Sequence, residues 1–370
     1  MEFIAQREIL LRALQRTLGI TEKKSPMPMV SAVLLEAMAP STLRLSATDM
    51  EVALTGEYTA DVIAPGRVAI AARQAADIVR SLSSDKVSFK LGANNWVEIS
   101  GGRAEFKLVG LSADEFPTLP STEGVALTPL HAETFRVLIE RTLFSVSTDE
   151  TRYNLMGVFV EPVQDGILRF VSSDGHRLSI AERRLEEGES VTIASDAIIP
   201  KKGLAEARRL LEGEGGFCNL GLQGNTFVFR HGDVTLMMRP IEGKFPDYRM
   251  VVPAAPKRIA TIGRAAFSEA LRRVALLAVD KANTTRLTFS QGKLELAAVT
   301  PQLGEAREEI EAELEGDDLR VGFNARYLLD ALAVIHTDTV RFELGDDQSP
   351  GVLKPSTAEG FLGVIMPIRI

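Results

Sequence analysis

The residues best able to do chemistry in this chain stand together in the segment Asp174-Gly175-His176-Arg177. A histidine beside an aspartate can act as a general base, because the carboxylate orients the imidazole and stabilises its protonated form. No serine or cysteine nucleophile motif accompanies this histidine, and the glycine-rich segment Gly213–Gly216 lacks the strand-to-helix context of a phosphate loop. A polar strand end followed by a glycine turn also explains the segment, so we expect a protein without catalytic activity.

Residues that could hold a metal or form a disulfide are few and scattered. The four histidines are His131, His176, His231 and His336, and their spacing is not that of a zinc site. Cys218 is the only cysteine, which favours a reducing compartment, and we expect a cytoplasmic protein. No apolar run approaches the roughly 20 residues that span a bilayer. The sequence therefore predicts no metal, no cofactor and no membrane insertion.

The elements that would position these residues recur three times, about 125 to 130 residues apart. Each copy opens with an amphipathic helix pattern, with apolar residues four apart on one face, at Arg7–Thr17, Ala132–Thr142 and Arg264–Val274. A strand pattern follows at Leu43–Asp49, Leu168–Asp174 and Leu294–Thr300. A strand running into a second helix comes next, at Val68–Leu82, Ala197–Leu211 and Val321–Ile335. The repeat predicts three copies of one domain.

Short turn signals separate the strands within each copy and indicate hairpins. Alternating apolar and polar residues predict half-buried strands at Val87–Leu91, Phe227–Arg230 and Val340–Leu344. Hairpin-linked strands with two helices per copy predict an α+β fold of antiparallel sheets, with the helices on one side. The first two copies end in Phe-Pro tails, Glu115–Pro120 and Lys244–Pro253. We therefore place the domains at 1–121, 122–253 and 254–370.

The charge of the chain is unevenly distributed. The whole chain has a net charge of −8, but the six predicted helices carry 15 basic and 7 acidic residues, which leaves −16 for the remainder. A basic excess confined to equivalent helices is typical of a surface that meets a polyanion such as nucleic acid. The simpler alternative is that lysine and arginine populate exposed helix faces, as they commonly do.

Several motifs together resemble those of the bacterial sliding clamps, the beta subunits of DNA polymerase III. They are Arg152-Tyr153 with Leu155 and Gly157, the segment 173–178, Phe245-Pro246-Asp247-Tyr248-Arg249, Gly322-Phe323-Asn324 with Tyr327, and the C-terminal segment 364–369. The resemblance covers essentially all 370 residues. It implies a head-to-tail homodimeric ring of six similar domains, with sheets outside and helices lining a central hole.

The same resemblance implies the function and the partners. The ring would encircle duplex DNA without sequence specificity and confer processivity without catalysis. The DNA polymerase III alpha subunit, the clamp loader, other DNA polymerases and repair proteins would bind through short linear motifs. Duplex DNA would be met by the basic inner face and by a tyrosine, and the candidate residues are Lys23, Lys24, Arg73, Arg80, Arg136, Tyr153, Lys201, Lys202, Arg208 and Arg272.

In the family, the linear motifs enter a groove between the second and third domains. The corresponding residues of this chain are Arg152, Leu155, Ser173, Gly175, His176, Arg177, Leu178, Pro246, Val251, Asn324, Tyr327, Val364, Met366, Pro367 and Arg369. The aliphatic members and Met366 would form an apolar cavity, and a methionine in its wall can adapt to varied ligands. Arg152, His176, Asn324 and Arg369 would supply hydrogen bonds at its rim.

The resemblance also implies a dimer interface between the first and third domains. Phe106, Lys107 and Leu108 would meet Leu276 and Leu277 of the other protomer. Opposite charges would fix the register, with Arg103 and Lys107 facing Glu305, Glu308 and Glu309. Alternatively, these are solvated charge clusters that never meet.

Two other classes of function remain open. One is a clamp paralogue that binds an inhibitor or a restricted set of partners. The other is an enzyme built on a repeated α+β domain, which would need its catalytic residues in a single copy. Partner binding distinguishes the paralogue from the replication clamp.

Overall fold

The computed structural model describes residues 1–22, 25–164, 166–189, 191, 193, 195–279, 282–357 and 360–369. Contacts between residues divide the chain into two compact units. Unit 1 comprises Met1–Phe135, Glu186–Ala194 and Lys202–Pro240, and unit 2 comprises Arg136–Leu185, Ser195–Lys201 and Ile241–Ile370. The middle copy of the repeat is thus shared between the units, and each unit has its own sheet.

Within the described residues, the strands of unit 1 form one sheet of 13 strands. Their order is β10 (Thr128–His131), β15 (Phe217–Gln223), β16 (Thr226–His231), β17 (Val234–Met238), β4 (Val52–Thr59), β3 (Thr42–Thr48), β2 (Ala32–Met38), β6 (Gly66–Ala71), β9 (Ala104–Leu111), β8 (Trp96–Gly101), β7 (Lys86–Leu91), β1 (Glu2–Gln6) and β5 (Asp61–Ala64). All the ladders between these strands are antiparallel, as expected from the hairpin signals.

The strands that the structure describes in unit 2 form a second sheet, of 12 strands. Their order is β14 (Ala197–Pro200), β11 (Gly157–Gln164), β12 (Ile167–Ser173), β13 (Arg177–Arg184), β25 (Phe361–Ile365), β24 (Gly351–Pro355), β23 (Thr339–Leu344), β18 (Arg258–Gly263), β21 (Gly304–Glu315), β20 (Lys293–Thr300), β19 (Thr284–Ser290) and β22 (Leu319–Asn324). These ladders are antiparallel too.

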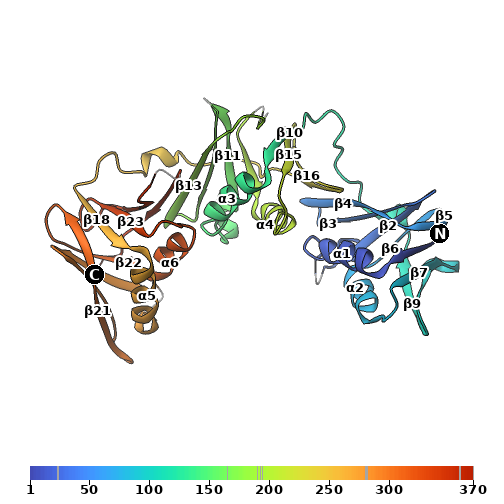
Figure 1. Ribbon diagram of the computed structural model, residues 1–370, viewed down its shortest axis with the longest axis horizontal. Coiled ribbons are helices and arrows are strands. Elements are labelled where there is room, and N and C mark those ends of the chain that lie inside the picture. Colours follow the sequence, from blue (N-terminus) through green and yellow to red (C-terminus); the bar gives the residue numbers. More distant parts are fainter. Residues whose placement is uncertain are drawn as a thin grey trace. The chain divides into compact units, whose positions relative to one another are not determined.

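The α-helices of the described residues are the six that the repeat predicts. They are α1 (Arg7–Thr17), α2 (Ala72–Ser81), α3 (Ala132–Leu143), α4 (Lys201–Leu210), α5 (Arg264–Val274) and α6 (Ala325–Ala333). Figure 1 shows α1 and α2 side by side against the strands of unit 1, and α5 and α6 in the same arrangement in unit 2. The helices thus gather on one side of each sheet, in agreement with the predicted α+β class.

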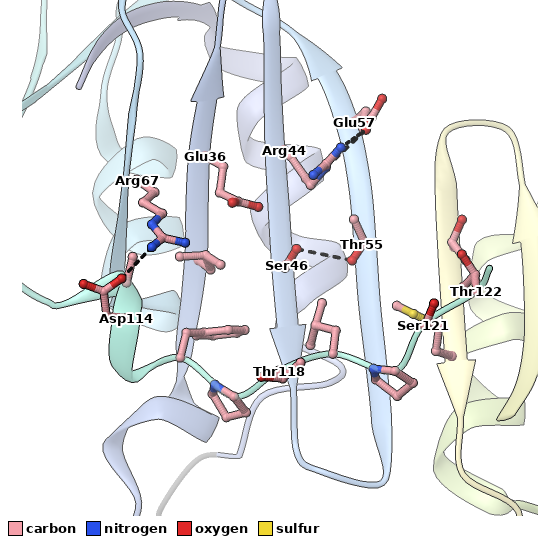
Figure 2. A pocket seen from close by; sticks show the side chains of 18 of the residues that line it. Glu36, Arg44, Ser46, Thr55, Glu57, Arg67, Asp114, Thr118, Ser121 and Thr122 are labelled. Carbon is pink, nitrogen blue, oxygen red and sulfur yellow. Dashed lines mark hydrogen bonds and ion pairs between the residues drawn. The ribbon is translucent and has the colours of Figure 1, made fainter. Parts of the chain in front are cut away.

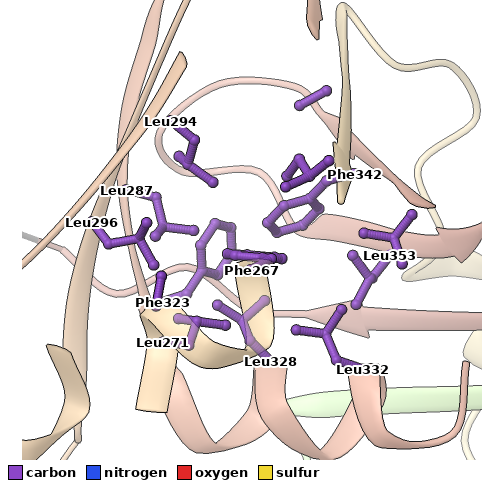
Figure 3. Packing of buried hydrophobic residues seen from close by; sticks show 14 of the residues in the cluster. Phe267, Leu271, Leu287, Leu294, Leu296, Phe323, Leu328, Leu332, Phe342 and Leu353 are labelled. Atoms are coloured by element: carbon purple, nitrogen blue, oxygen red, sulfur yellow. The ribbon is translucent and has the colours of Figure 1, made fainter. Parts of the chain in front are cut away.

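The helices pack through the apolar face that their spacing predicts. Phe267 and Leu271, four residues apart on α5, are both fully buried. Figure 3 shows them among side chains from the sheet and from α6, with Phe267 in the middle of the labelled residues. The ring centroids of Phe323 and Phe342 are 5.3 Å apart. Burial of these rings fixes the helix against the sheet and leaves its polar face exposed.

Candidate functional site

A small apolar cavity lies in unit 2, where the Phe-Pro tail of the second repeat crosses the sheet. Its volume is about 160 Å³. It is lined by Leu155, Ser173, Gly175, Arg177, Leu178, Phe245, Pro246, Tyr248, Val251, Val364 and Met366. A cavity of this size with mostly aliphatic and aromatic walls can take an apolar side chain of a ligand.

One wall of the cavity is the tail itself, which we call the second strap (residues 244–251). The ring of Phe245 stacks on Phe159 of β11, with centroids 5.0 Å apart. Tyr248, in the short 3₁₀ helix η5 (Tyr248–Met250), donates its hydroxyl to Glu161 Oε2 at 2.6 Å. Arg249 of the strap also donates to Glu161. The strap is therefore fixed by aromatic packing at one end and by a carboxylate at the other.

Glu161 is the electrostatic centre of this attachment. Burial by itself would raise the pKa of its carboxyl, but hydrogen bonds from Tyr248, Arg169 and Arg249 outweigh burial and lower that pKa. The Arg169 guanidinium bridges Glu161 and Glu182, with Nη1 to Glu161 Oε2 at 2.8 Å and Nε to Glu182 Oε1 at 2.5 Å. Burial and the bond to Glu161 raise the pKa of Tyr248 to about 12, so its hydroxyl stays a donor at neutral pH.

The opposite wall depends on Arg177, whose side chain is 10% exposed. Its guanidinium donates to Asp174 Oδ2 at 3.0 Å, to Asp330 Oδ2 of α6 at 2.6 Å, and to the carbonyl of Phe144 at 2.7 Å. The same guanidinium lies 4.4 Å from the centre of the Tyr327 ring. These contacts join the cavity edge to the helix side of the unit.

The C-terminal segment closes the cavity as an extension of β25. The backbone amide of Met366 donates to the carbonyl of His176 at 3.0 Å, and that of Ile368 donates to Gly322 at 2.8 Å. Val364 and Met366 therefore point to one side of the extended chain, toward the cavity they line.

The structure brings together most of the residues predicted for the partner-binding groove. Leu155, Ser173, Gly175, Arg177, Leu178, Pro246, Val251, Val364 and Met366 all line the cavity. Arg152, His176, Asn324, Tyr327, Pro367 and Arg369 do not. Arg152 lies at the edge, where its Nη1 donates to the carbonyl of Asp174 at 3.1 Å.

Asn324, predicted to supply a hydrogen bond at the rim of the groove, has a structural role at the start of α6. Its Oδ1 accepts from the backbone amides of Arg326 and Tyr327, at 2.9 and 3.3 Å, and so caps the start of α6. The side chain is only 8% exposed. The sequence placed Asn324 directly before a helix, which is the usual position of such a cap.

The Asp174 carboxylate does not orient the His176 ring as a general base would require. The Asp174 carboxylate accepts from the backbone amides of His176 and Arg177, at 2.9 and 3.0 Å, and from the Arg177 guanidinium. Among the described residues, none forms a hydrogen bond with the His176 ring. Asp174 therefore shapes the turn before β13, in agreement with the polar strand end considered for this segment.

Phe245 and Tyr248 line the cavity but were not predicted to do so. Both belong to the Phe-Pro tail, which was identified as a marker of a domain end and as a family motif, but only Pro246 and Val251 of this tail were assigned to the groove. Its two aromatic residues next to a proline were the available signal, because an apolar tail has to bury its rings on a neighbouring surface.

The residues expected to meet DNA differ in their surroundings. Arg73 and Arg272 are exposed on their helices, and Tyr153 in the 3₁₀ helix η4 (Glu150–Leu155) is 49% exposed. Arg80 pairs with Asp77 at 2.6 Å. Arg208, on α4, is half-buried.

The remaining DNA candidates are more constrained or lie outside the description. Arg136 pairs with Glu140 at 2.8 Å within α3. Lys201 is half-buried, and this burial lowers its pKa. Lys202 donates to Asp49 and to the carbonyl of Ile20, so its ammonium already serves a contact within unit 1. Lys23 and Lys24 lie outside the described residues.

The residues expected at a dimer interface lie on exposed strand edges and on the segment after α5. Phe106 and Leu276 are 36% and 74% exposed, while Leu108 and Leu277 are half-buried. Arg103 and Glu305 are exposed. The other charged candidates pair within the chain, in the ion pairs Lys107–Glu98, Glu308–Arg273 and Glu309–Lys293.

Two kinds of feature are absent from the described residues. They contain no group of three or more histidine, cysteine, aspartate or glutamate residues placed to hold a metal ion. No helix among them is both long enough and apolar enough to cross a membrane.

Models of the DNA polymerase III beta subunit family match the chain from end to end. The N-terminal domain matches residues 1–120, the central domain 129–247 and the C-terminal domain 249–369. The beta sliding clamp of Pseudomonas putida is 35% identical over 374 residues, which cover 100% of both chains. That of Caulobacter vibrioides is 34% identical over 376 residues, again covering 100% of both.

Solved structures agree with the sequence comparison. The DNA polymerase sliding clamp from Bacillus subtilis matches with a TM-score of 0.94 at 25% identity, over 100% of this chain and 99% of that one. The sliding clamp from Bartonella birtlesii, solved with griselimycin bound, matches with a TM-score of 0.93 at 30% identity, over 100% of both chains. The chain, with its three tandem clamp domains, therefore belongs to the DNA polymerase III beta subunit family, the beta sliding clamps.

Proposed function

We propose that the chain forms a head-to-tail homodimeric ring that encircles duplex DNA and tethers partner proteins to it. The observation that carries the proposal is the apolar cavity of unit 2, bounded by the second strap and the C-terminal segment. Such a cavity can hold the apolar side chain of a short linear motif from the DNA polymerase III alpha subunit, the clamp loader, or other polymerases and repair proteins. The ring confers processivity in the cytoplasm and catalyses no reaction.

DNA would be held by enclosure and by weak contacts. The six helices carry a net charge of +8 in an otherwise acidic chain, and Arg73 and Arg272 are exposed on two of them. Phosphate contacts are independent of sequence and weaken with salt, whereas enclosure does not. A modest basic surface therefore suits a protein that slides, because tight neutralisation of the phosphates would stop it.

Ring closure would join two strand edges. Residues 104–109 of β9 pair with β8, and the pairing of β9 with β6 is limited to Gly110 and Leu111. Residues 304–311 of β21 pair with β20 alone among the described strands. We place these two edges against each other across the dimer, with Phe106 and Leu276 in the contact. Unpaired edges favour such an association, since their backbone groups lack partners.

The domain boundaries at 121/122 and 253/254 belong to the same proposal. The family models end at residues 120 and 247 and begin again at 129 and 249, which supports both boundaries. The division into two contact units does not oppose them, because strands of neighbouring clamp domains join into one sheet within each unit.

A topology assay tests the ring. After loading by its own clamp loader, the protein should remain on nicked circular plasmid in high salt and be lost when the plasmid is linearised. Leu276→Asp should halve the solution mass and abolish retention, because a charge would be buried in the interface. Equal loss of the unmodified protein from circular and linear DNA would contradict enclosure.

A peptide titration tests the cavity. Leu178→Ala with Met366→Ala removes apolar wall from β13 and from the C-terminal segment, and burial of one large apolar side chain is worth roughly 1.5–3 kcal/mol. The affinity for a fluorescent polymerase-motif peptide should therefore fall at least about tenfold. Met250→Ala is the matched control, because Met250 is 84% exposed and lies outside the cavity. Unchanged affinity in the double variant would show that the motif binds elsewhere.

A further inference from the structure

Unit 1 contains a groove under the Phe-Pro tail of the first repeat, which we call the first strap (residues 113–122). The groove has a volume of about 660 Å³. Figure 2 shows the first strap crossing β2, β3 and β4, with charged side chains of these strands and of β6 beyond the Ser46–Thr55 pair. The groove therefore combines the apolar side chains of the strap with a charged end.

The charged end is a row of alternating charges on neighbouring strands. Glu36 on β2 lies opposite Arg67 of β6 on one side and opposite Arg44 of β3 on the other. Arg67 Nη2 donates to Asp114 Oδ1 at 2.5 Å, and Arg44 donates to Glu57 Oε1 at 2.8 and 3.2 Å. Both arginines thus pair with carboxylates other than Glu36, as the dashed lines in Figure 2 show. Within the described part of the chain, Glu36 has no hydrogen-bond or ion-pair partner.

Unit 2 contains the same row of alternating charges on neighbouring strands, but there the glutamate accepts hydrogen bonds from several donors. Glu161 lies opposite Arg169, and Arg169 lies opposite Glu182. Besides Arg169, Glu161 accepts hydrogen bonds from Tyr248 and Arg249, both supplied by the second strap. The repeat therefore shows what a complete arrangement around this carboxylate looks like: one phenol and one strap guanidinium.

The first strap cannot supply these donors. When the Phe-Pro pairs of the two straps are aligned, Leu119 stands where Tyr248 does and Pro120 stands where Arg249 does. Neither leucine nor proline carries a side-chain donor. The two strap substitutions therefore remove two of the three donors that Glu161 has, and the third counterpart, Arg44, donates to Glu57 instead.

We propose that this groove binds a segment of a partner protein in which an arginine follows an aromatic residue. The arginine guanidinium pairs with the Glu36 carboxylate, and the aromatic ring lies against apolar lining such as Leu34 and Met237. A guanidinium suits this site better than an ammonium, because its planar donors match a carboxylate in pairs. The site is separate from the cavity of unit 2 and would let the clamp hold a second partner segment.

Peptide binding to the full-length protein tests the proposal. The probe is a fluorescein-labelled peptide Asp-Tyr-Arg-Met-Val, the sequence of residues 247–251 of the chain. A second probe replaces its arginine by citrulline, which keeps the shape and removes the charge. In anisotropy titrations we expect the arginine peptide to bind at least about tenfold more tightly than the citrulline peptide, since a charged hydrogen bond is lost.

Variants of the protein locate the site. Glu36→Gln should reduce the affinity of the arginine peptide about tenfold or more. Asp61→Asn, at an exposed carboxylate of β5 outside the groove, should leave it unchanged. The double variant Leu119→Tyr with Pro120→Arg gives the first strap its own donors, so it should lose peptide binding although Glu36 is intact. Circular dichroism and polymerase-motif binding establish that this variant is folded.

Several results would overturn the proposal. They are absence of binding up to millimolar peptide, equal binding of the arginine and citrulline peptides, and full binding by Glu36→Gln. Displacement of the probe by the polymerase-motif peptide would place it in the cavity of unit 2 instead. An acidic peptide that binds more tightly than the probe and depends on Arg230 would assign the groove to anions, because Arg230 donates only to Thr235 Oγ1 among the described residues.

Discussion

Removal of one hydroxyl from the second strap should loosen the wall of the apolar cavity in unit 2. Tyr248→Phe keeps the ring and its edge contact with Phe159, at a centroid distance of 6.4 Å, and deletes the 2.6 Å hydrogen bond to Glu161. A hydrogen bond to a charged group contributes roughly 1.5–3 kcal/mol. Arg169 and Arg249 remain on the carboxylate, so the lower end applies, about 1.5 kcal/mol.

The pH dependence follows from the pKa of Glu161. Its folded pKa is lowered from the ordinary 4.5 by hydrogen bonds that outweigh its burial, so its ionised form stabilises the folded strap. This stabilisation is fully present above pH 4.5 and is lost as the pH falls through the folded pKa. The difference between the parent and Tyr248→Phe should therefore be constant from pH 6 to 8 and shrink in acid.

Hydrogen exchange followed by mass spectrometry measures this local stability. The reporter is a peptide containing the backbone amide of Val251, which donates to the carbonyl of Tyr248 at 3.1 Å. A loss of about 1.5 kcal/mol corresponds to about tenfold faster exchange at neutral pH. Tyr153→Phe is the matched control in the same unit, because Tyr153 is 49% exposed. Equal exchange in the parent and Tyr248→Phe would refute the role assigned to the Glu161 attachment.

Three further substitutions or treatments test other parts of the structure. Arg177→Met leaves Asp174 and Asp330 without their shared cation and should lower the stability of unit 2 by about 3 kcal/mol in urea denaturation; an unchanged midpoint would contradict the bridging role. Gly175→Ala places a Cβ 2.1 Å from Arg152 Nη1 at a φ of +87°, so thermal denaturation should show a loss of about 1–2 kcal/mol. Burial raises the pKa of the Cys218 thiol to about 12, so a thiol reagent at pH 8 should modify it only after urea is added; rapid labelling without urea would show that this strand opens.

The repeat and its elements could be predicted from the sequence, because they depend on local spacing. Apolar residues four apart, such as Phe267 and Leu271, define a helix face wherever the helix packs. Alternation within segments such as 340–344 likewise defines a strand. The aliphatic lining of the cavity, including Leu178 and Val364, followed from resemblance to family motifs, and the structure places these residues together.

Only the tertiary structure decided which polar side chains are already used. The side-chain oxygen of Asn324 caps a helix. The carboxylate of Asp174 accepts hydrogen bonds within a turn and from Arg177. Sequence shows that such residues are present, but their hydrogen-bond partners depend on atoms brought together by folding. Likewise, Glu36 and Glu161 occupy equivalent positions in the repeat, and the sequence alone does not show that their surroundings differ. Among the described residues Glu36 has no partner, whereas Glu161 accepts from Arg169 of its own sheet and from Tyr248 and Arg249 of the second strap. The two strap donors are missing in unit 1 because the first strap carries leucine and proline at those positions.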